Sequence, residues 1–511
     1  MELIDNLLLG LQVAAEPTTL AYCFFGVLLG TVVGVLPGIG ALAAISLLLP
    51  ITYHIPPTAA IIMLAGVYYG AQYGGSTASI LLNLPGTPSS AVTCLDGYPM
   101  AKKGRSGLAL FVTTIASLVG AMSGLILLVL FSPMIADLGL KFGPAEFFSM
   151  MVLGLVAASS MSSGSAAKGL AMVVFGLLLG MVGTDVNSGV ARYHFGLPEL
   201  MDGINLVALA MGLFGIAEVV RCINADHTNQ QPERVTMRSM MPTREEFKAT
   251  IAPMLRGSAL GSALGALPGV GPSIAAFMSY AIEKRVAKDP SRFGKGAIEG
   301  ISAPESANNA AAQTAFVPSL SLGIPGDAVM AVMMGALIIH GITPGPLLIS
   351  EQPELFWGLV VSFMIGNIML VVLNIPTIGL WVALLRIPFA WMYPAILVFV
   401  ALGVYSVNNN EFDIYMVAVL GVLGYALMVL KFEPAPLLLG YILGPMVEEN
   451  LRRAMLLSRG DPAIFINRPI SAGLLAVTAA LLLWAIWSTV RRAVAAKRAL
   501  DVAEGLSLIH I

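Results

Sequence analysis

Long apolar runs that are broken near their middles dominate the hydropathy pattern of this chain. The run over residues 18–52 is interrupted at Pro37 by the sequence GVLPGIG, and the run over residues 257–283 is interrupted at Pro268 by GALPGVG. Proline removes a backbone donor and glycine exposes the backbone, so each break predicts two half-helices that meet at a tip. Inside a membrane, such a tip is tolerated only where it is buried in protein or lines a wet cavity.

A second break follows each first one. The sequence LNLPGT contains Pro85 in the front half, and LGIPGD contains Pro325 in the back half. The first breaks are 231 residues apart (268 minus 37) and the second breaks are 240 apart (325 minus 85), so both halves keep the same order of parts. Paired breaks at matching positions of two apolar halves are the sequence pointer to a transporter binding site.

This pattern predicts an all-α integral membrane protein built from two repeats, with about 10–12 transmembrane segments. The first repeat is expected over residues 18–220, a polar cytoplasmic linker over 221–256, the second repeat over 257–450, and an extra membrane helix over 470–489. The strand-like alternation of a membrane barrel is absent from the sequence. The expected unbroken helices lie near residues 57–75, 106–131, 143–160, 165–182, 199–220, 355–380, 390–406, 414–430 and 435–450.

Positive charge in the loops predicts that the two repeats have opposite orientations in the membrane. The loop after the first break is neutral in front (51–56) but basic behind (284–295), and the loops after the second breaks show the reverse. Since cytoplasmic loops hold the excess of Lys and Arg, equivalent loops are expected on opposite sides. Each half of the 257–283 element is too short to cross alone, which favours a re-entrant hairpin. A group of four arginines disagrees with this topology: Arg452, Arg453, Arg459 and Arg468.

Composition supports an integral membrane protein and argues against several other classes of protein. The 511 residues are 57% hydrophobic and 11% charged, against about 25% charge in soluble domains. A net charge of −2 without a basic patch gives no reason to expect nucleic acid. Three cysteines without CxxC spacing and five scattered histidines indicate neither disulfides nor a metal site. The first residues lack the positive region of a cleaved signal, so we expect a retained interfacial helix before Pro17.

An anionic substrate suits the breaks, because half-helix N-termini carry free N–H groups and partial positive charge. The apolar segments hold almost no Lys or Arg at their centres, so hydroxyls, amides and glycine-exposed backbone are expected to receive the anion. The candidate substrate-binding residues are Gly38, Gly40, Ser76, Thr77, Asn83, Gly86, Thr87, Gly269, Gly271 and Gly326. Ser89 and Ser90 belong to the same polar stretch.

A co-bound cation is expected beside the anionic substrate, because acids buried in a membrane are costly and are functional by default. The candidate cation-coupling residues are Glu305, Asn308, Asn309, Gln313 and Asp327. Sodium, bound with backbone carbonyls, and a proton on Glu305 are both compatible with these residues. Asn308 and Asn309 could instead bond neighbouring helices, and Asp327 could cap the next helix.

Other polar groups have simpler interpretations. Tyr68, Tyr69 and Tyr73 are expected to pack rather than bind, and the pairs Glu448/Arg452 and Glu449/Arg453 have the spacing of local ion pairs. An intramembrane hydrolase would need a paired acid or a nucleophile with a base, and Asp327 lacks such a partner in sequence. An ion-independent anion channel remains the main alternative, although paired repeats favour alternating access.

Several motifs are specific enough to indicate a family. They are GVLPGIG (34–40), YGAQYGGS (69–76), LPGTP (84–88), PESANN (304–309), LGP (443–445) and EENLRR (448–453). Over residues 18–470 the chain resembles the large membrane subunit of the tripartite tricarboxylate transporter family. The resemblance implies a multi-pass carrier in a bacterial inner membrane that takes up carboxylates by secondary active transport. It also implies a small four-span membrane subunit and a periplasmic solute-binding protein as partners, no catalytic residues, and no cofactor beyond the coupling ion. It leaves the particular carboxylate open.

Overall fold

The computed structural model describes residues 2–36, 40–139, 141–159, 166–185, 188–223, 235, 237–267, 270–384, 389–484 and 486–487. These residues are almost entirely helical, as the hydropathy pattern predicts, and one short strand pair interrupts them. The chain forms two compact units, one of residues 1–141 with 204–426 and one of residues 142–203 with 427–511. Each unit takes segments from both predicted repeats, so the compact units do not test the repeat boundaries.

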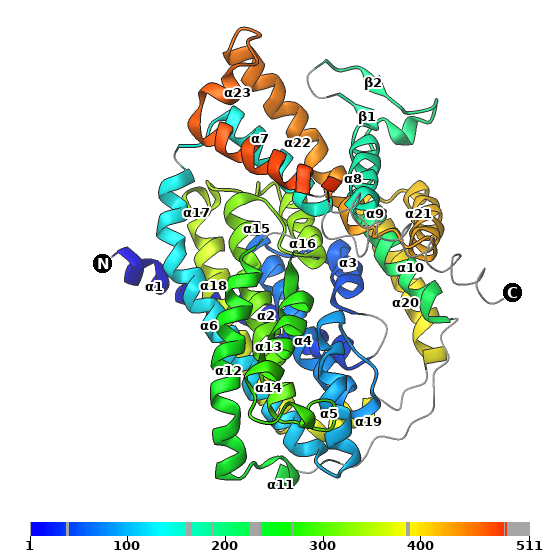
Figure 1. Ribbon diagram of the computed structural model, residues 1–511. Helices are drawn as coiled ribbons and strands as arrows, with labels where there is room; N and C mark the ends of the chain where they lie inside the picture. Colours follow the sequence, from blue (N-terminus) through cyan, green and yellow to red (C-terminus); the bar gives the residue numbers. More distant parts are fainter. Residues whose placement is uncertain are drawn as a thin grey trace, which may run out of the picture. The chain divides into compact units, whose positions relative to one another are not determined.

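The front part of the first unit runs from the N-terminus to α6 (Figure 1). Its elements are α1 (Glu2–Ala14), α2 (Pro17–Val35), α3 (Gly40–Thr52), α4 (Pro57–Leu82), the short 3₁₀ helix η1 (Pro88–Ala91), α5 (Thr93–Lys102) and α6 (Ser106–Gly139). Both α2 and α4 begin with proline at the first turn, where the missing N–H would have no helical partner in any case. The polar stretch that follows residue 75 continues α4 rather than ending it.

The back part of the first unit begins with a helix that contains a π-helical segment. These elements are α9 (Leu206–Ala210), the π segment η3 (Met211–Ile216), α10 (Ala217–Ile223), α11 (Met237–Met240), α12 (Arg244–Gly265), α13 (Gly271–Val286) and η4 (Pro290–Arg292). They are followed by α14 (Glu299–Thr314), α15 (Phe316–Leu322), α16 (Ala328–Ile339), α17 (Leu348–Glu351), α18 (Pro353–Asn374), α19 (Ile378–Leu384), α20 (Phe389–Asn408) and α21 (Glu411–Val429).

Four helices in the described ranges are long and apolar enough to cross a membrane. They lie at Pro17–Val35, Ser106–Phe131, Pro353–Asn374 and Glu411–Val429. Seven shorter apolar helices accompany them, among them the half-helices α3 and α16. The expected 10–12 segments therefore do not all appear as unbroken spans, because breaks shorten some helices and buried polar residues lower the hydropathy of α4 and α14.

Glycine-mediated packing repeats between the two halves with the offsets of the breaks. A Cβ on Gly26, Gly30 or Gly34 of α2 would lie 2.2–2.4 Å from the carbonyl oxygens of Met63, Val67 and Ala71 on α4. The equivalent glycines of α12, Gly257, Gly261 and Gly265, meet Ala303, Ala307 and Ala311 of α14 in the same way. The glycines are 231 residues apart and their partners 240 (257 minus 26 and 303 minus 63), so these two helix pairs pack in the same way. Close helix approach through small residues is typical of membrane interfaces.

The same contacts show that the chain reverses at each first break. Residue numbers rise together along α2 and α4, so these two helices are parallel. The intervening helix α3 must therefore run in the opposite direction. The pair α12 and α14 is parallel in the same sense, and α13 returns beside them (Figure 1). A bidentate ion pair of 2.5 and 3.0 Å joins Arg256 of α12 to Glu283 of α13, on the two arms of this hairpin.

The predicted hairpin shape is therefore present, but the length argument for it was wrong in one arm. Helix α12 begins at Arg244, inside the stretch interpreted as linker, and its 22 residues span about 33 Å. A capping box between Thr243 and Glu246 fixes this start, because each side chain bonds the other residue's backbone N–H. The opposite membrane orientation of the two halves stays a prediction.

The Gly261→Ala variant tests this helix packing. Its Cβ would lie 2.1 Å from the Ala307 carbonyl oxygen, so α12 and α14 would have to separate. We expect a loss of at least about 2 kcal/mol of stability, measured as a lower melting temperature and a smaller monodisperse fraction in detergent. Gly379→Ala is the matched control, because a Cβ there meets no atom within 4 Å. Equal melting temperatures for the two variants would contradict the packing.

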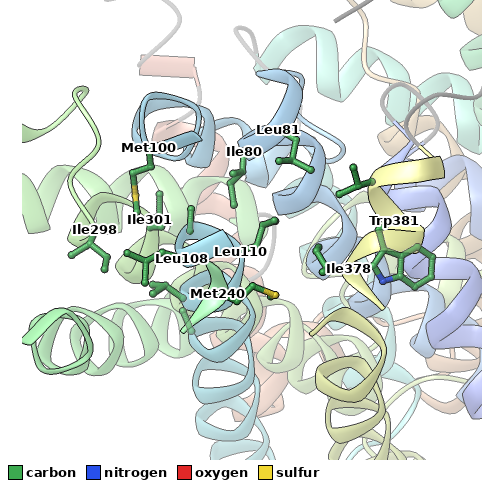
Figure 2. Packing of buried hydrophobic residues seen from close by; sticks show 14 of the residues in the cluster. Ile80, Leu81, Met100, Leu108, Leu110, Met240, Ile298, Ile301, Ile378 and Trp381 are labelled. Carbon is green, nitrogen blue, oxygen red and sulfur yellow. The ribbon is translucent and has the colours of Figure 1, made fainter. Parts of the chain in front are cut away.

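A buried carboxylate holds the start of α14 against α5. Asp96 is fully buried and accepts hydrogen bonds from the Gly296 and Ala297 N–H groups at 2.7 and 2.8 Å. The Tyr280 hydroxyl of α13 donates to the same carboxylate at 2.9 Å. These three donors link α5 of the front half to α13 and α14 of the back half. Apolar packing surrounds the link: Figure 2 shows Met100, Ile298 and Ile301 of the buried cluster beside Leu108 of α6.

The second unit contains helices and the strand pair. Its elements are α7 (Pro144–Ser159), α8 (Ala166–Gly180), β1 (Gly183–Thr184), β2 (Ala191–Arg192), η2 (Pro198–Leu200), α22 (Ala435–Leu457), α23 (Ile464–Asn467) and an apolar helix at Pro469–Trp484. Strands β1 and β2 are antiparallel. Helix α22 packs on α7 and α8.

Ion pairs in this unit account for three of the four arginines that disagreed with the predicted topology. Arg452 pairs with Glu448 at 2.5 Å, and Arg453 pairs with Glu449 at 2.5 Å, which confirms the local pairs. Arg452 also reaches Asp185 beside the strand pair, at 3.2 Å. Arg468 pairs with the buried Glu146 at 2.5 Å. These contacts give the three arginines structural roles that do not depend on the side of the membrane.

Candidate functional site

The helix breaks of both halves converge in the first unit. In the front half, a Cβ on Gly86 would lie 1.8 Å from the Gly34 carbonyl oxygen, so the second break lies against the last turn of α2. In the back half, a Cβ on Gly271 would lie 3.1 Å from the Asp327 Cβ. Contacts also cross between halves, because α3 packs on α16 and α13 packs on η1. The described residues that flank the four breaks thus lie together in the first unit.

The two second breaks share one backbone design. Asn83 and Gly323 end their helices in the left-handed conformation, with φ of 58° and 64°, and a Pro-Gly pair follows each. Thr87 and Asp327 then occupy equivalent positions before the next helix, both with extended backbone. Asn83 itself is exposed, so the structure gives it the role of a helix C-cap.

Uncharged side chains surround the front break. The Ser89 hydroxyl donates to the Gln72 side-chain oxygen at 2.7 Å, and the Thr87 hydroxyl reaches the same oxygen at 3.3 Å. Ser90 accepts the Thr87 N–H at 3.1 Å and thereby caps the short helix η1. This break therefore presents hydroxyl and amide groups and no charge of its own.

The back break carries a carboxylate instead. One oxygen of Asp327 accepts the Met330 N–H at 2.8 Å, which makes Asp327 the N-cap of α16. The other oxygen accepts a hydrogen bond from the Tyr68 hydroxyl of α4. The capping alternative for Asp327 is thus realised in the structure. Gly326, just before it, lies against Ala315, and its lack of a side chain allows the backbone of the back break to approach Ala315 closely.

A row of buried polar side chains on α14 lies beside the breaks. Thr93 of α5 donates to one oxygen of Glu305, and Asn309 donates to Ser117 of α6 at 2.8 Å. Several of the row's polar atoms have no hydrogen-bond partner among the described residues: Glu305 Oε2, both polar atoms of Asn308, Asn309 Oδ1 and Gln313 Oε1. Buried polar groups almost always have partners, so such a row calls for an ion, water or substrate.

The structure brings four of the five predicted cation residues together on α14 and places Asp327 elsewhere, at the start of α16. Among the predicted substrate residues, Gly40 and Gly271 begin α3 and α13 with φ of 68° and 65°. Ser76 and Thr77 are buried in α4, where Ser76 donates to the Tyr73 carbonyl at 2.8 Å. Gly38 and Gly269, at the tips of the first breaks, lie outside the described residues.

Sequence reasoning missed several partners at these breaks. Gln72 could have been noticed as a lone amide among small residues of α4, whereas Thr93 and Ser117 carry no signal in the sequence. The tyrosines are buried, as expected for packing residues, but two of them also donate hydrogen bonds, Tyr68 to Asp327 and Tyr73 to Asn367. No group of three His, Cys, Asp or Glu side chains that could hold a transition metal occurs in the described part of the chain.

Helix breaks lined by buried polar groups, in a mostly helical protein with helices long and apolar enough to cross a membrane, are typical of membrane transporters. The chain matches the sequence profile of the tripartite tricarboxylate transporter TctA family over residues 20–439, and it belongs to that family.

Two relatives from Agrobacterium vitis are similar to this chain. One, described as an uncharacterized 52.8 kDa protein in the TAR-I ttuC' 3' region, is 51% identical over 491 residues, which are 96% of this chain and 98% of the relative. The other, described as an uncharacterized protein in the TAR-II ttuC' 3' region, is 54% identical over 235 residues, which are 46% of this chain and 96% of the relative. No solved structure matches the chain.

Proposed function

We propose that this protein is the substrate-translocating membrane subunit of a secondary active uptake system for di- or tricarboxylates. The observation that carries the proposal is the meeting of four helix breaks beside a row of buried, unpartnered oxygens. Family membership supplies the substrate class. Broken helices near the membrane midplane are the usual binding site of such carriers.

The carboxylate is proposed to bind where half-helices begin. Among the described residues no side chain caps the N-terminus of helix α13, so the first-turn N–H groups, apart from Pro272 which has none, are proposed to receive an anion. The front break adds the hydroxyls of Thr87 and Ser89 close to η1, which packs on α13. Gly40 and Gly271 allow the left-handed backbone that starts each returning half-helix.

The coupling cation is proposed to bind the α14 row. Glu305 Oε2, Asn308 Oδ1, Asn309 Oδ1 and Gln313 Oε1 are oxygens of the type that hard cations prefer. Sodium would be held by several of these oxygens together, whereas a proton would reside on Glu305 alone. Either cation would offset the charge of the bound carboxylate, which supports coupled rather than independent entry.

The two equivalent halves support alternating access, with the hairpins α2–α3 and α12–α13 opening the site to opposite sides. The proposed location is a bacterial inner membrane. The proposed partners are a small four-span membrane subunit and a periplasmic solute-binding protein that delivers the carboxylate.

Uptake of labelled citrate or succinate into proteoliposomes that contain all three components tests this function. The expected result is accumulation that requires a sodium or proton gradient and stops when both gradients are collapsed. Uptake that follows the substrate gradient alone would contradict the proposal and favour an anion channel.

A further inference from the structure

We propose that Asp327 determines the charge selectivity of the substrate site, acting as a fixed anion that disfavours the most highly charged carboxylates. The inference rests on the proposed carboxylate function. It begins from the equivalence of Asp327 and Thr87, which are 240 residues apart (327 minus 87) and occupy the same place after a Pro-Gly pair. The two breaks have one backbone design but differ by one charge.

The carboxylate of Asp327 occupies an N-terminus that a substrate could otherwise use. Its Oδ1 accepts the Met330 N–H at 2.8 Å, within the first turn of the 12-residue helix α16. Its Oδ2 accepts the Tyr68 hydroxyl, and its side chain is partly buried beside Gly271. A negative group at a helix N-terminus is stabilised by the helix dipole, so this position already holds its anion.

The position of Asp327 also lets its charge act on the proposed substrate site. Gly271 begins α13, whose free N-terminus is the proposed carboxylate receptor, and a Cβ there would meet Asp327. No basic side chain is hydrogen-bonded to Asp327 within the described ranges, so no cationic partner neutralises its charge. A fixed negative charge in a poorly solvated site repels each further negative charge that a substrate brings.

Asp327→Asn is the informative variant, because asparagine is as good an N-cap as aspartate. The amide oxygen can still accept the Met330 N–H and the amide group can still meet Tyr68, so the shape is kept and only the charge is lost. Tricarballylate and glutarate are the probes, since they share a carbon skeleton and differ by one carboxylate. Asp413→Asn is the matched control, a buried Asp-to-Asn change on α21.

Initial uptake rates of both probes are compared in the reconstituted system. Asp327→Asn is expected to raise the ratio of tricarballylate to glutarate uptake about tenfold over wild type, whereas Asp413→Asn leaves the ratio unchanged. If uptake by Asp327→Asn is too slow to measure, the ratio of binding constants from thermal-shift titration of the purified protein replaces it, with the same expectation.

An unchanged ratio in folded Asp327→Asn protein would overturn the inference. So would a variant in which only the cation dependence changes, because Asp327 would then be a cation ligand and not a selectivity residue. Failure of the proposed function looks different: wild-type protein would neither bind nor transport either probe, and the inference would fall with it.

Discussion

Glu305→Gln is expected to lower cation-driven carboxylate uptake by at least about 100-fold while leaving the fold intact. Glutamine keeps the size of the side chain and an oxygen that can accept the Thr93 hydroxyl. It removes the only carboxylate of the α14 row, which is buried and has one oxygen without a partner in the described part of the chain. The variant therefore loses the charge that attracts the cation.

Three measurements on this variant separate coupling from folding. Melting temperature in detergent is expected to match wild type. Uptake against a gradient should be lost, but exchange of substrate for substrate across the membrane should persist if a proton is the coupling ion, because glutamine resembles the protonated acid. Glu449→Gln is the control, since that carboxylate is half-exposed and its ion pair within the described ranges is with Arg453 of the same helix. Uptake by the Glu305→Gln variant at the wild-type rate would show that Glu305 is not required for coupling.

Gly86→Ala is expected to abolish uptake, with the protein still inserted in the membrane. A Cβ at this position would lie 1.8 Å from the Gly34 carbonyl oxygen and 2.8 Å from the Gly75 Cα. No flexible side chain can move aside there, so the front break must shift away from α2 and α4. A displacement of about 1 Å at a binding site is enough to lose roughly 100-fold in activity.

Gly104→Ala is the control for the glycine change itself. Gly104 has φ of 72° and nothing within 4 Å of a Cβ. Alanine there is therefore destabilising only because of the left-handed backbone. Membrane insertion, monodispersity and uptake are measured for both variants. Equal uptake by Gly86→Ala and Gly104→Ala would mean that the two front breaks do not need to touch.

The sequence was sufficient to predict the helical membrane class, the four breaks and the matching helix pairs α2/α4 and α12/α14, whereas the inverted repeat stays a prediction. These features depend on proline and glycine positions, which act locally and therefore leave a direct signal. Gly26, Gly30 and Gly34 recur as glycines 231 residues later. This repeat is also visible in the sequence, because each glycine lies where two helices touch.

The contacts between distant segments could not be predicted in the same way. Tyr68 and Asp327 are 259 residues apart, and Thr93 and Glu305 are 212 apart. Their pairing depends on how α4, α5 and α14 pack, which no local pattern specifies. The start of α12 was also missed, since charged residues 244–256 suggested a linker although a capping box and helix-forming residues continue the helix through them.

Hydropathy also failed to identify one of the helices at the centre of the proposed site. Helices α4 and α14 are buried along nearly their whole length, yet α14 has a composition too polar to be identified as a membrane segment. Protein, and not lipid, surrounds such helices, so they can carry Glu305 and its neighbouring amides. Low hydropathy in the middle of a membrane protein was therefore a signal of the site itself.

We expect a carboxylate and a cation to bind together at the four breaks. The most direct measurement is the affinity of the purified protein for a carboxylate, with sodium replaced by choline in one series and pH varied in the other. We predict that at least one cation increases the affinity about tenfold or more, and that the carboxylate increases the affinity for that cation by the same factor. Carboxylate affinity that is the same in sodium, in choline and at every pH would show that no cation binds together with the carboxylate.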